Sequence, residues 1–580
     1  MAIVGIDLGT TNSLIAAYAD GKSILIPNPY NEVLTPSVVS LNEDGELSVG
    51  KAAKERLVTN PELSASLFKR DMGTDKKVTL GKKSFLPEEL SSFVLRQLLS
   101  DAEKYLGEPV TEAIVSVPAY FNAHQRAATK RAGLLSGTKV ERLINEPSAA
   151  ALACRQDCDE TFIVFDFGGG TLDVSIVESF DNIINICAIS GNNLLGGADF
   201  DRMIAEAVCA ENGIEISSLS KQEFQTLLRV SESAKIRVSE NDSARITAIL
   251  NKREISYTLN NDLLLQLSGG VLERLRRPIQ LAMKDSGLSA SDIDKCILVG
   301  GSCRMPIVRD YLFDLLRVPI DDGDDVNKMV ALGLGMYAGI KQRDLEVKDL
   351  VLTDICPFSL NTNVHNEQNP NKHLSYTMIP RNATLPASKT QQFFTIKPGQ
   401  TKIVMQISQG EQVYADDNIK LGDLSVNVPY NRKEHEKINM TFSYDINAIL
   451  AAEIEVVSTG AVRSLVLTGS GLELSEKEIQ RSLHNIKNLN LAHLERSGLL
   501  LERAKRIYTE SDDFLRIRLM EIILVLENVS PGGSIRKINE TLDAVEEYLE
   551  DIERKMGYSD IFNEPAFLTV IKGGAGESDE

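Results

Sequence analysis

Residues 3–12, with the sequence IVGIDLGTTN, are the stretch that decides the fold. A short, partly β-branched apolar run leads to Asp7 and is typical of a buried strand. Gly9 stands where that strand must turn sharply, and backbone N–H groups exposed by a tight turn can hold phosphate oxygens. Thr10 and Thr11 add hydroxyl donors, and Asp7 suits magnesium, which prefers oxygen ligands and keeps several waters. Taken alone, the stretch is equally compatible with an ordinary hairpin.

Two later stretches favour the phosphate-binding interpretation. Residues 162–174, FIVFDFGGGTLDV, repeat the design of an apolar run, an aspartate and a glycine turn. Two hairpins of one design indicate duplicated halves that face each other across a cleft. Residues 297–306, ILVGGSCRMP, end another apolar run in Gly300 and Gly301, where the backbone can lie flat against a nucleoside. Together the three stretches predict a nucleotide site.

Length and charge narrow the classes of function. A chain of 580 residues predicts three or four domains. The formal net charge of −20 argues against nucleic acid or a membrane surface as the main partner, because phosphate groups attract basic faces. No run of about 18 apolar residues predicts a membrane span, and the first residues lack the pattern of a secretory signal. Seven cysteines, an odd number, argue against a disulfide framework, so we expect a cytoplasmic protein.

The pattern of the chain changes four times along its length. Residues 1–344 alternate strand and helix patterns, with helices expected at 88–104, 123–135, 203–212 and 272–284 and a strand at 113–117. Residues 345–354 form an apolar linker that can dock as a strand. Residues 355–472 predict an all-β domain, with strands at 392–397, 402–408, 438–444, 450–458 and 462–468. Helices follow over 473–556, opened by a capping box at 475–478, and residues 557–580 predict a flexible tail.

Seven motifs carry a resemblance to a known family. In chain order they are IDLGTTNS (6–13), SVPAYFN (116–122), INEPSAAAL (144–152), FDFGGGTLDVS (165–175), LGGADFD (195–201), SAKIRVS (233–239) and LVGGSCRMP (298–306). The sequence resembles the seventy-kilodalton heat-shock chaperones of the DnaK type, and within them it looks closest to the bacterial HscC branch. The resemblance covers residues 1 to about 555. It implies an actin-like α/β ATPase domain, an all-β sandwich that grips extended peptides, and an α-helical lid.

The resemblance implies a role for each residue that matches a family motif. The residues expected to carry catalysis are Lys69, which orients the attacking water, Glu146, Asp166 and Thr171. Those expected to bind the nucleotide are Gly9, Thr10, Thr11, Asn12, Gly168, Gly169, Gly170, Gly196, Gly197, Glu232, Lys235, Ser239, Gly300, Gly301, Ser302 and Arg304. Those expected to hold a hydrated metal are Asp7, Asp166 and Asp173. The implied cofactors are ATP or ADP and Mg²⁺, with K⁺ as a further candidate.

The same resemblance implies a coupling device and a peptide pocket. The coupling residues are Pro118, Arg126, Asp349, Leu350, Leu352 and Asp354, and the peptide-binding residues are Phe393, Ile396 and Ile403. The chain departs from the family pattern at Thr353, where an aliphatic residue is usual, at the polar stretch 361–374 and at Asn327, where an aspartate is usual. The implied partners are unfolded or extended client peptides and a J-domain co-chaperone.

Three functions stay open on the sequence alone. The first is an ATP-dependent chaperone in which hydrolysis is coupled to peptide capture and release. The second is an actin-like sugar kinase, which would carry the same phosphate hairpins but neither the linker nor the all-β block. The third is a nucleotide sensor that binds without a chaperone cycle. Turnover of ATP with and without an extended apolar peptide separates the three.

Overall fold

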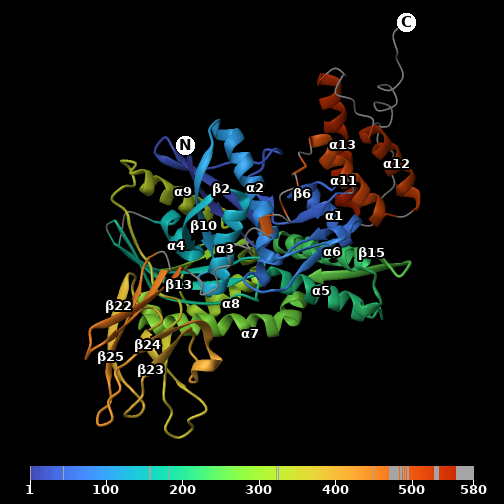
Figure 1. The fold of residues 1–580 in the computed structure, drawn as a ribbon. Coiled ribbons are helices and arrows are strands. Elements are labelled where there is room, and N and C mark those ends of the chain that lie inside the picture. The colour runs from blue at the N-terminus through green and yellow to red at the C-terminus, as the bar shows by residue number, and fades with distance from the viewer. Residues whose placement is uncertain are drawn as a thin grey trace.

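The computed structural model describes most of the chain (Figure 1). The described residues are 2–42, 45–155, 159–180, 182–321, 323, 325–446, 449–468, 482–483, 486, 489, 491–492, 495–511, 513–527 and 535–556. The capping box expected at 475–478 and the tail expected at 557–580 lie outside them. The domain boundaries expected at 344, 354, 472 and 556 stay predictions.

Two six-stranded sheets of related topology form the first part of the chain. The first has the order β11-β10-β1-β2-β3, with β4 beside β2. Its strands are β1 (Ala2–Asp7), β2 (Asn12–Ala19), β3 (Lys22–Leu25), β4 (Thr35–Pro36), β10 (Val110–Val117) and β11 (Lys139–Asn145). The second has the order β18-β17-β12-β13-β14-β19. Its strands are β12 (Glu160–Phe167), β13 (Leu172–Phe180), β14 (Ile183–Asn192), β17 (Lys295–Val299), β18 (Ile320–Asp321) and β19 (Val351–Thr353).

The duplication expected from the two glycine hairpins is visible in the pairing of these strands. In the first sheet β1 pairs antiparallel with β2 and parallel with β10. In the second sheet β12 pairs antiparallel with β13 and parallel with β17. Each glycine turn therefore connects the two strands of a central hairpin, and both hairpins lie at equivalent places in their sheets.

Helices α4 (Glu146–Ala153) and α9 (Met329–Gln342) pack between the two sheets. Apolar residues of both sheets and both helices form one core there, including Ile144, Val164, Ala150 and Leu334. The helices expected from the sequence are present but longer than expected: α2 (Pro87–Leu106), α3 (Ala123–Ser136), α5 (Gly197–Glu211) and α7 (Asn261–Ser286). The other helices of this part are α1 (Lys51–Thr59), α6 (Lys221–Glu240) and α8 (Pro306–Leu316).

Short sheets complete this part. A three-stranded sheet has the order β6-β5-β7, and two hairpins join β8 to β9 and β15 to β16. The strands are β5 (Val39–Leu41), β6 (Leu47–Val49), β7 (Ser64–Ala65), β8 (Val78–Leu80), β9 (Lys83–Phe85), β15 (Ser243–Leu250) and β16 (Arg253–Asn260). The arrangement of this part fits the actin-like α/β fold that the resemblance implies.

A pair of four-stranded sheets follows, with the orders β21-β20-β23-β24 and β22-β25-β26-β27. The strands are β20 (Leu360–Val364), β21 (Leu374–Ile379), β22 (Ala387–Phe394), β23 (Lys402–Gln409), β24 (Ile419–Asn427), β25 (Lys437–Tyr444), β26 (Ile449–Val456) and β27 (Ala461–Thr468). Inward side chains such as Ile407 and Phe442 form their common core. The strand expected at 392–397 begins and ends earlier, and the polar stretch 361–374 begins as β20 rather than as loop.

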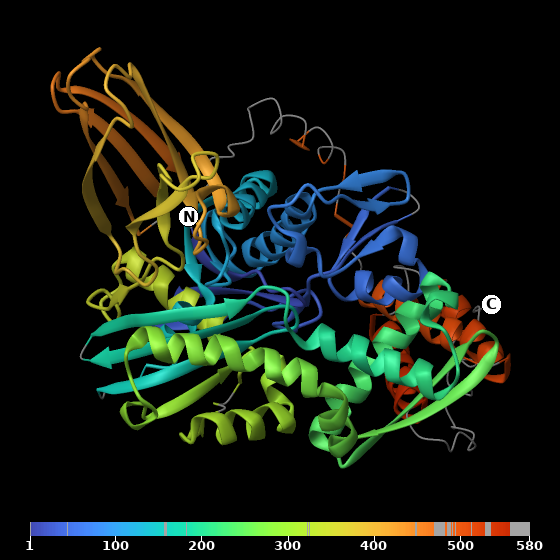
Figure 2. The same cartoon turned by 90° about the horizontal axis from the view of Figure 1, so that it is seen from below.

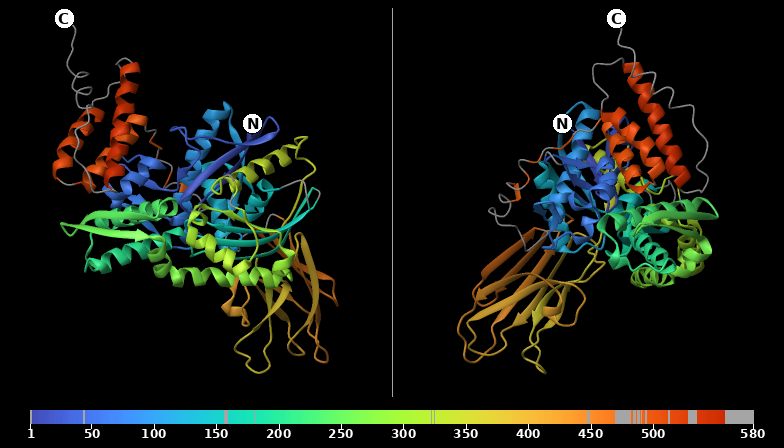
Figure 3. Two further views of the ribbon diagram at one scale, coloured as in Figure 1. Left: turned by 180° about the vertical axis from the view of Figure 1, so that it is seen from behind. Right: turned by 90° about the vertical axis from the view of Figure 1, so that its right-hand side faces the viewer.

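Three C-terminal helices, α11 (Arg496–Glu510), α12 (Asp513–Glu527) and α13 (Ile535–Met556), share a core that includes Ile507, Leu519 and Val545. Figures 2 and 3 show this bundle on the opposite side of the molecule from the β-sandwich. It packs against α1 rather than on the sandwich strands. Among the described helices, none combines the length and apolar character needed to cross a bilayer.

Candidate active site

A cleft of about 1520 Å³ opens between the two sheets and receives residues from both glycine hairpins. Most residues expected to bind a nucleotide line it. These are Asp7, Gly9, Thr10, Thr11, Asn12, Lys69, Glu146, Asp166, Gly168, Gly169, Thr171, Gly197, Glu232, Lys235, Ser239, Gly300, Gly301, Ser302 and Arg304. Gly170, Gly196 and Asp173 are not among the lining residues, but Asp173 pairs across the hairpin with Asp166, and a Cβ atom built on Gly196 would lie 2.4 Å from the Gly170 amide nitrogen. The sequence motifs therefore converge on one place in the fold.

The two glycine turns approach each other closely. A Cβ atom built on Gly169 would lie 2.3 Å from Thr11 Cγ2, and one built on Gly170 would lie 2.3 Å from Thr10 Cγ2. Both distances are far inside van der Waals contact, so a side chain at either glycine would force the hairpins apart. The second hairpin is also held from behind, because the Gly197 amide donates to the Gly168 carbonyl oxygen at 3.0 Å.

Three aspartates lie at the base of the cleft, of which Asp166 and Asp173 are buried and Asp7 is half-buried. Asp7 ends β1, and Asp166 and Asp173 are cross-strand partners in the β12–β13 hairpin. Ser116 Oγ donates to Asp7 Oδ1 at 2.8 Å, and the Tyr120 amide donates to Asp173 Oδ1 at 3.1 Å. Asp173 Oδ2 is buried and has no hydrogen-bond partner among the described residues.

Burial dominates the electrostatics of these carboxyl groups. Burial, reinforced by the nearby Glu146 charge, raises the pKa of Asp7 to about 7 and the pKa of Asp173 to about 8. The same causes raise the pKa of Asp166 well above its usual value. A cation would relieve this accumulation of negative charge, and carboxylate oxygens are the donors that Mg²⁺ prefers. Among the described residues, no group of three acidic, His or Cys side chains is placed to chelate a metal directly.

Lys69 and Glu146 form a buried ion pair beside the aspartates. Lys69 lies in a 3-10 turn (Phe68–Asp71), Glu146 is the first residue of α4, and Lys69 Nζ donates to Glu146 Oε1 at 2.7 Å. The Lys69 residue is 3% exposed and Glu146 6% exposed. Lys69 is therefore not a solvated surface lysine, which is the usual state of this residue type.

The far end of the cleft is built from α6 and the turn after β17. Lys235 Nζ donates to the Gly197 carbonyl oxygen at 3.0 Å and pairs with Asp201 at 2.7 Å. Ser302 Oγ donates to the Gly168 carbonyl oxygen at 2.8 Å. These bonds connect the expected nucleoside-binding elements to the second phosphate hairpin.

Sequence reasoning missed Arg70 and Asp201. Arg70 Nη2 pairs with Asp199 Oδ2 at 2.6 Å, and its Nε donates to the Gly170 carbonyl oxygen at 3.2 Å. Arg70 thus crosses from the first half of the cleft to the second hairpin. The only sequence signal for a role of Arg70 in the site was its position directly after Lys69. This signal is weak, because an isolated arginine in a polar stretch is usually a surface residue.

The linker is docked on the second sheet. Val351, Leu352 and Thr353 pair parallel with β14 as strand β19, which confirms the expectation that this segment can dock as a strand. Leu350 is buried against Tyr18, whereas Val351 and Asp349 are exposed. Thr353 takes its place in the ladder despite its departure from the family pattern.

Asn145, which was not among the expected coupling residues, joins two of them, Arg126 and Asp354, at the end of this linker. Asn145 Nδ2 donates to both carboxylate oxygens of Asp354 at 2.9 Å. Arg126 Nη2 donates to Asn145 Oδ1 at 2.5 Å and to the Ala119 carbonyl oxygen at 3.1 Å, next to the buried Pro118. Burial raises the pKa of Asp354, while the Ile355 amide and the Asn145 side chain oppose this rise. Asn145 immediately precedes Glu146, so these contacts lead to the cleft.

The three expected peptide-binding residues have different surroundings. Ile403 is buried in the sandwich core, and Phe393 is partly buried with its ring centroid 5.3 Å from that of Tyr376. Ile396 is 54% exposed. The structure does not bring the three together at one exposed surface, and their role in peptide binding stays a prediction.

A family model described as Hsp70 protein matches residues 3–555 of this chain. The chain belongs to the Hsp70 family. Members of the Hsp70 family bind and hydrolyse ATP and bind unfolded client peptides, so this chain is a chaperone ATPase in general terms. The match extends over the cleft, the docked linker, the sandwich and the C-terminal helices, which agrees with the family expected from the seven motifs.

Proposed function

We propose that this Hsp70 protein is a Mg²⁺-dependent ATPase in which hydrolysis drives the capture and release of extended apolar peptides. The observation that carries the proposal is the continuous path from Lys69 through Glu146 and the adjacent Asn145 to Asp354 at the end of the docked linker. Through such a path, a change at the phosphate site can shift the linker between its docked and undocked states.

The cleft residues have distinct tasks in this reaction. Mg²⁺, when bound, would neutralise charge on the phosphates, and Asp7, Asp166 and Asp173 would hold its waters. The glycine turns supply backbone N–H groups, and Thr10, Thr11, Asn12 and Thr171 supply side-chain donors. Lys69 orients the attacking water and stabilises the negative charge that develops during phosphoryl transfer. Glu146 holds the Lys69 ammonium group in position.

The linker is the switch element of the proposal. Leu350 and Leu352 bury apolar surface while β19 is paired with β14, and this burial is lost when the linker leaves the sheet. A segment that is stably docked in only one of two states of the protein couples the two parts that it connects. We infer that the docked linker here corresponds to the state in which the sandwich and the ATPase part act as one unit.

The specialised features complete the proposal. Within the family, we infer an HscC-like specialisation from the sequence motifs. We also propose K⁺ as a further cofactor and a J-domain protein as co-chaperone. The proposed location is the cytoplasm. The peptide would bind through main-chain hydrogen bonds and an apolar pocket around Phe393, Ile396 and Ile403.

Measurement of steady-state ATP turnover with and without an extended apolar peptide tests the function. We expect Mg²⁺-dependent turnover that the peptide accelerates. Turnover that ignores the peptide, or nucleotide binding without turnover, would contradict the coupled cycle and favour a nucleotide sensor. Turnover that depends on a sugar would favour the kinase.

A further inference from the structure

The C-terminal bundle lies at the mouth of the nucleotide cleft. Helix α1 forms one side of this mouth through Glu55, and helix α6 forms the other side through Arg229. Leu500, Arg503 and Arg506 of α11 line the same opening. The bundle therefore contacts the cleft itself, although the sequence alone assigned these helices to a lid.

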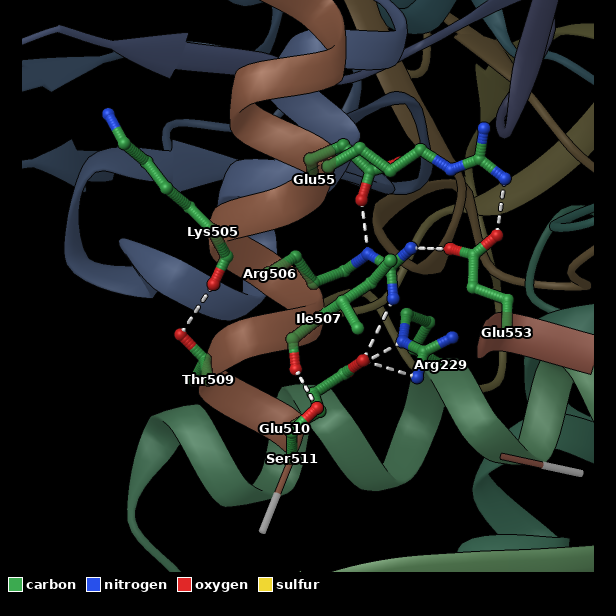
Figure 4. Close-up of polar contacts among 10 residues, drawn as sticks. Glu55, Arg229, Lys505, Arg506, Ile507, Thr509, Glu510, Ser511 and Glu553 are labelled. Carbon is green, nitrogen blue, oxygen red and sulfur yellow. Dashed lines mark hydrogen bonds and ion pairs between the residues drawn. The ribbon is translucent and has the colours of Figure 1, made fainter. Parts of the chain in front are cut away.

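A chain of ion pairs crosses the mouth from one side to the other (Figure 4). Arg506 pairs with Glu55 of α1 and, at 2.8 Å, with Glu510 one turn further along α11. Glu510 in turn accepts two hydrogen bonds from Arg229 of α6, Nε to Oε1 at 2.7 Å and Nη2 to Oε2 at 2.6 Å. Arg506 and Glu510 of α11 thus join the two sides of the cleft.

The third helix of the bundle adds to this cluster. Glu553 of α13 pairs with both Arg503 and Arg506. The three arginines of the cluster, counting Arg229, are balanced by Glu55, Glu510 and Glu553. Such a balance is what a buried group of charges requires, because an unpaired charge away from water is strongly unfavourable.

The central pair of the cluster is buried, unlike most ion pairs on helix surfaces. Arg506 is 3% exposed and Glu510 8% exposed. Burial by itself would lower the pKa of Arg506, but the carboxylates of Glu55, Glu510 and Glu553 outweigh it and raise that pKa. Exposed ion pairs contribute little and are screened by salt, whereas loss of one partner from a buried pair is costly. The contact is therefore specific enough to hold the bundle in place.

A second contact strengthens the attachment to α1. Arg56 donates to Ser40 Oγ at 2.9 Å and pairs with Glu502 of α11 at 3.4 Å. Lys54 of α1 also pairs directly with Glu232 of α6 at 3.1 Å, below the bundle. The two sides of the mouth are thus held together in two ways. Lys54 and Glu232 join them directly, and α11 joins them through its own ion pairs.

We propose that α11–α13 act as a clasp that holds the two sides of the nucleotide cleft together and slows the exit of nucleotide. The inference rests on the proposed function, because it concerns the nucleotide of the same cleft. Nucleotide leaves faster when the sides of the mouth can separate, and separation requires that the Glu55–Arg506–Glu510–Arg229 chain breaks. The bundle thereby regulates exchange from within the chain.

Release of a fluorescent ADP analogue from the full-length protein tests the clasp. The protein is loaded with N-methylanthraniloyl-ADP and Mg²⁺ and mixed with excess unlabelled ADP in a stopped-flow instrument. Glu510→Gln keeps the shape of the side chain but removes the charge that joins Arg506 to Arg229. We expect the release rate constant to rise about tenfold, as for the loss of a buried charge pair.

Arg496→Gln is the matched control. Arg496 lies on the same helix, and its ion pairs with Asp543 and Glu546 stay within the bundle. We expect this variant to release the analogue at the parent rate. Equal acceleration by both variants would overturn the proposal, because it would show that general loosening of the bundle, not the bridge, controls release.

A second variant breaks the bridge from the opposite side. Arg229→Gln removes the contact from α6 and leaves the bundle itself unaltered, so it serves if Glu510→Gln does not fold. Parent-like release from a folded variant of either kind would overturn the clasp while leaving the proposed function intact. Failure of the parent chain to bind the analogue would instead overturn the proposed function, and the clasp with it.

Discussion

Asn145 Nδ2 lies 2.9 Å from both carboxylate oxygens of Asp354, and the next residue, Glu146, holds Lys69 in the cleft. One peptide unit therefore separates a contact with the linker from a contact with the catalytic lysine. Rotation of the start of α4 would move both contacts together. This relationship leads to the first prediction.

Asp354→Ala removes the acceptor for Asn145 and leaves the linker strand without its terminal anchor. We expect the peptide-dependent increase in ATP turnover to fall at least about fivefold, because a buried hydrogen-bonded carboxylate contributes on the order of 1–3 kcal/mol. Steady-state turnover with and without peptide measures the effect. Lys348→Ala, at an exposed position of the same linker that is not among the expected coupling residues, is the control and should keep the response.

Lys69→Ala should leave ATP binding nearly normal and abolish turnover. The side chain contacts Glu146 rather than the glycine turns, so its loss removes orientation of the water more than affinity for the nucleotide. Equilibrium binding and single-turnover hydrolysis separate the two quantities. Lys76→Ala, at an exposed lysine paired with Asp71, should hydrolyse ATP at the parent rate, and unchanged turnover in Lys69→Ala would remove this lysine from the mechanism.

Leu350→Asp combined with Leu352→Asp should uncouple peptide from hydrolysis. Leu350 packs on Tyr18 and Leu352 packs against the core between the sheets, so two carboxylates there favour the undocked linker. Val351 lies between them and is 51% exposed, so Val351→Asp is a control that places a carboxylate on the same segment without burying it. Peptide stimulation that survives the double substitution would show that the linker is not the switch.

Gly333→Ala should destabilise the contact between α9 and α4. A Cβ atom there would lie 1.7 Å from the Ala149 carbonyl oxygen, so the helices must separate at a cost of about 1–3 kcal/mol or more. Gly269 lies in the exposed interior of α7 with no atom within 4 Å of its Cβ position. Gly269→Ala should therefore stabilise the protein by about 0.5–1 kcal/mol. Thermal denaturation of both variants checks the opposite signs.

Asp101→Asn should stabilise the protein by an amount that depends on pH. Asp101 is buried in α2, Gln97 Nε2 donates to its Oδ1 at 2.9 Å, and its Oδ2 has no hydrogen-bond partner among the described residues. Burial raises the pKa of Asp101 to about 6. The unfolded chain loses this proton near pH 4, so the carboxyl group destabilises the fold increasingly from about pH 4 to 6 and by a constant amount above.

The difference in melting temperature between Asp101→Asn and the parent should therefore grow between about pH 4.5 and pH 7. The growth corresponds to a change of about 2 kcal/mol in the free energy of unfolding. Melting curves at both pH values measure it. A lower melting temperature for the variant at pH 7, or a difference that does not change with pH, would contradict the assignment.

The local elements could be predicted because neighbouring residues determine them. The apolar runs before Asp7 and Asp166 and the glycine turns after them predicted two equivalent hairpins. The linker 345–354 was expected to dock as a strand, and its residues 351–353 do so. Strand bounds were less accurate where the signal was weak, as at 392–397. The first part of the polar stretch 361–374 is a strand because β20 pairs antiparallel with β21 and with the more distant β23.

The sequence by itself determined the family, the paired phosphate turns and the identity of most residues in the cleft, since each of these is recorded in a short continuous motif. Only the tertiary structure decided that Asn145 binds Asp354, that Arg70 crosses the cleft, and that Arg506 and Glu510 join α1 to α6. In the sequence, Asn145 and the charged residues Arg70, Arg506 and Glu510 look like ordinary solvated surface residues. Their partners in other elements lie dozens to hundreds of positions away, and only folding brings such polar and charged groups together out of water.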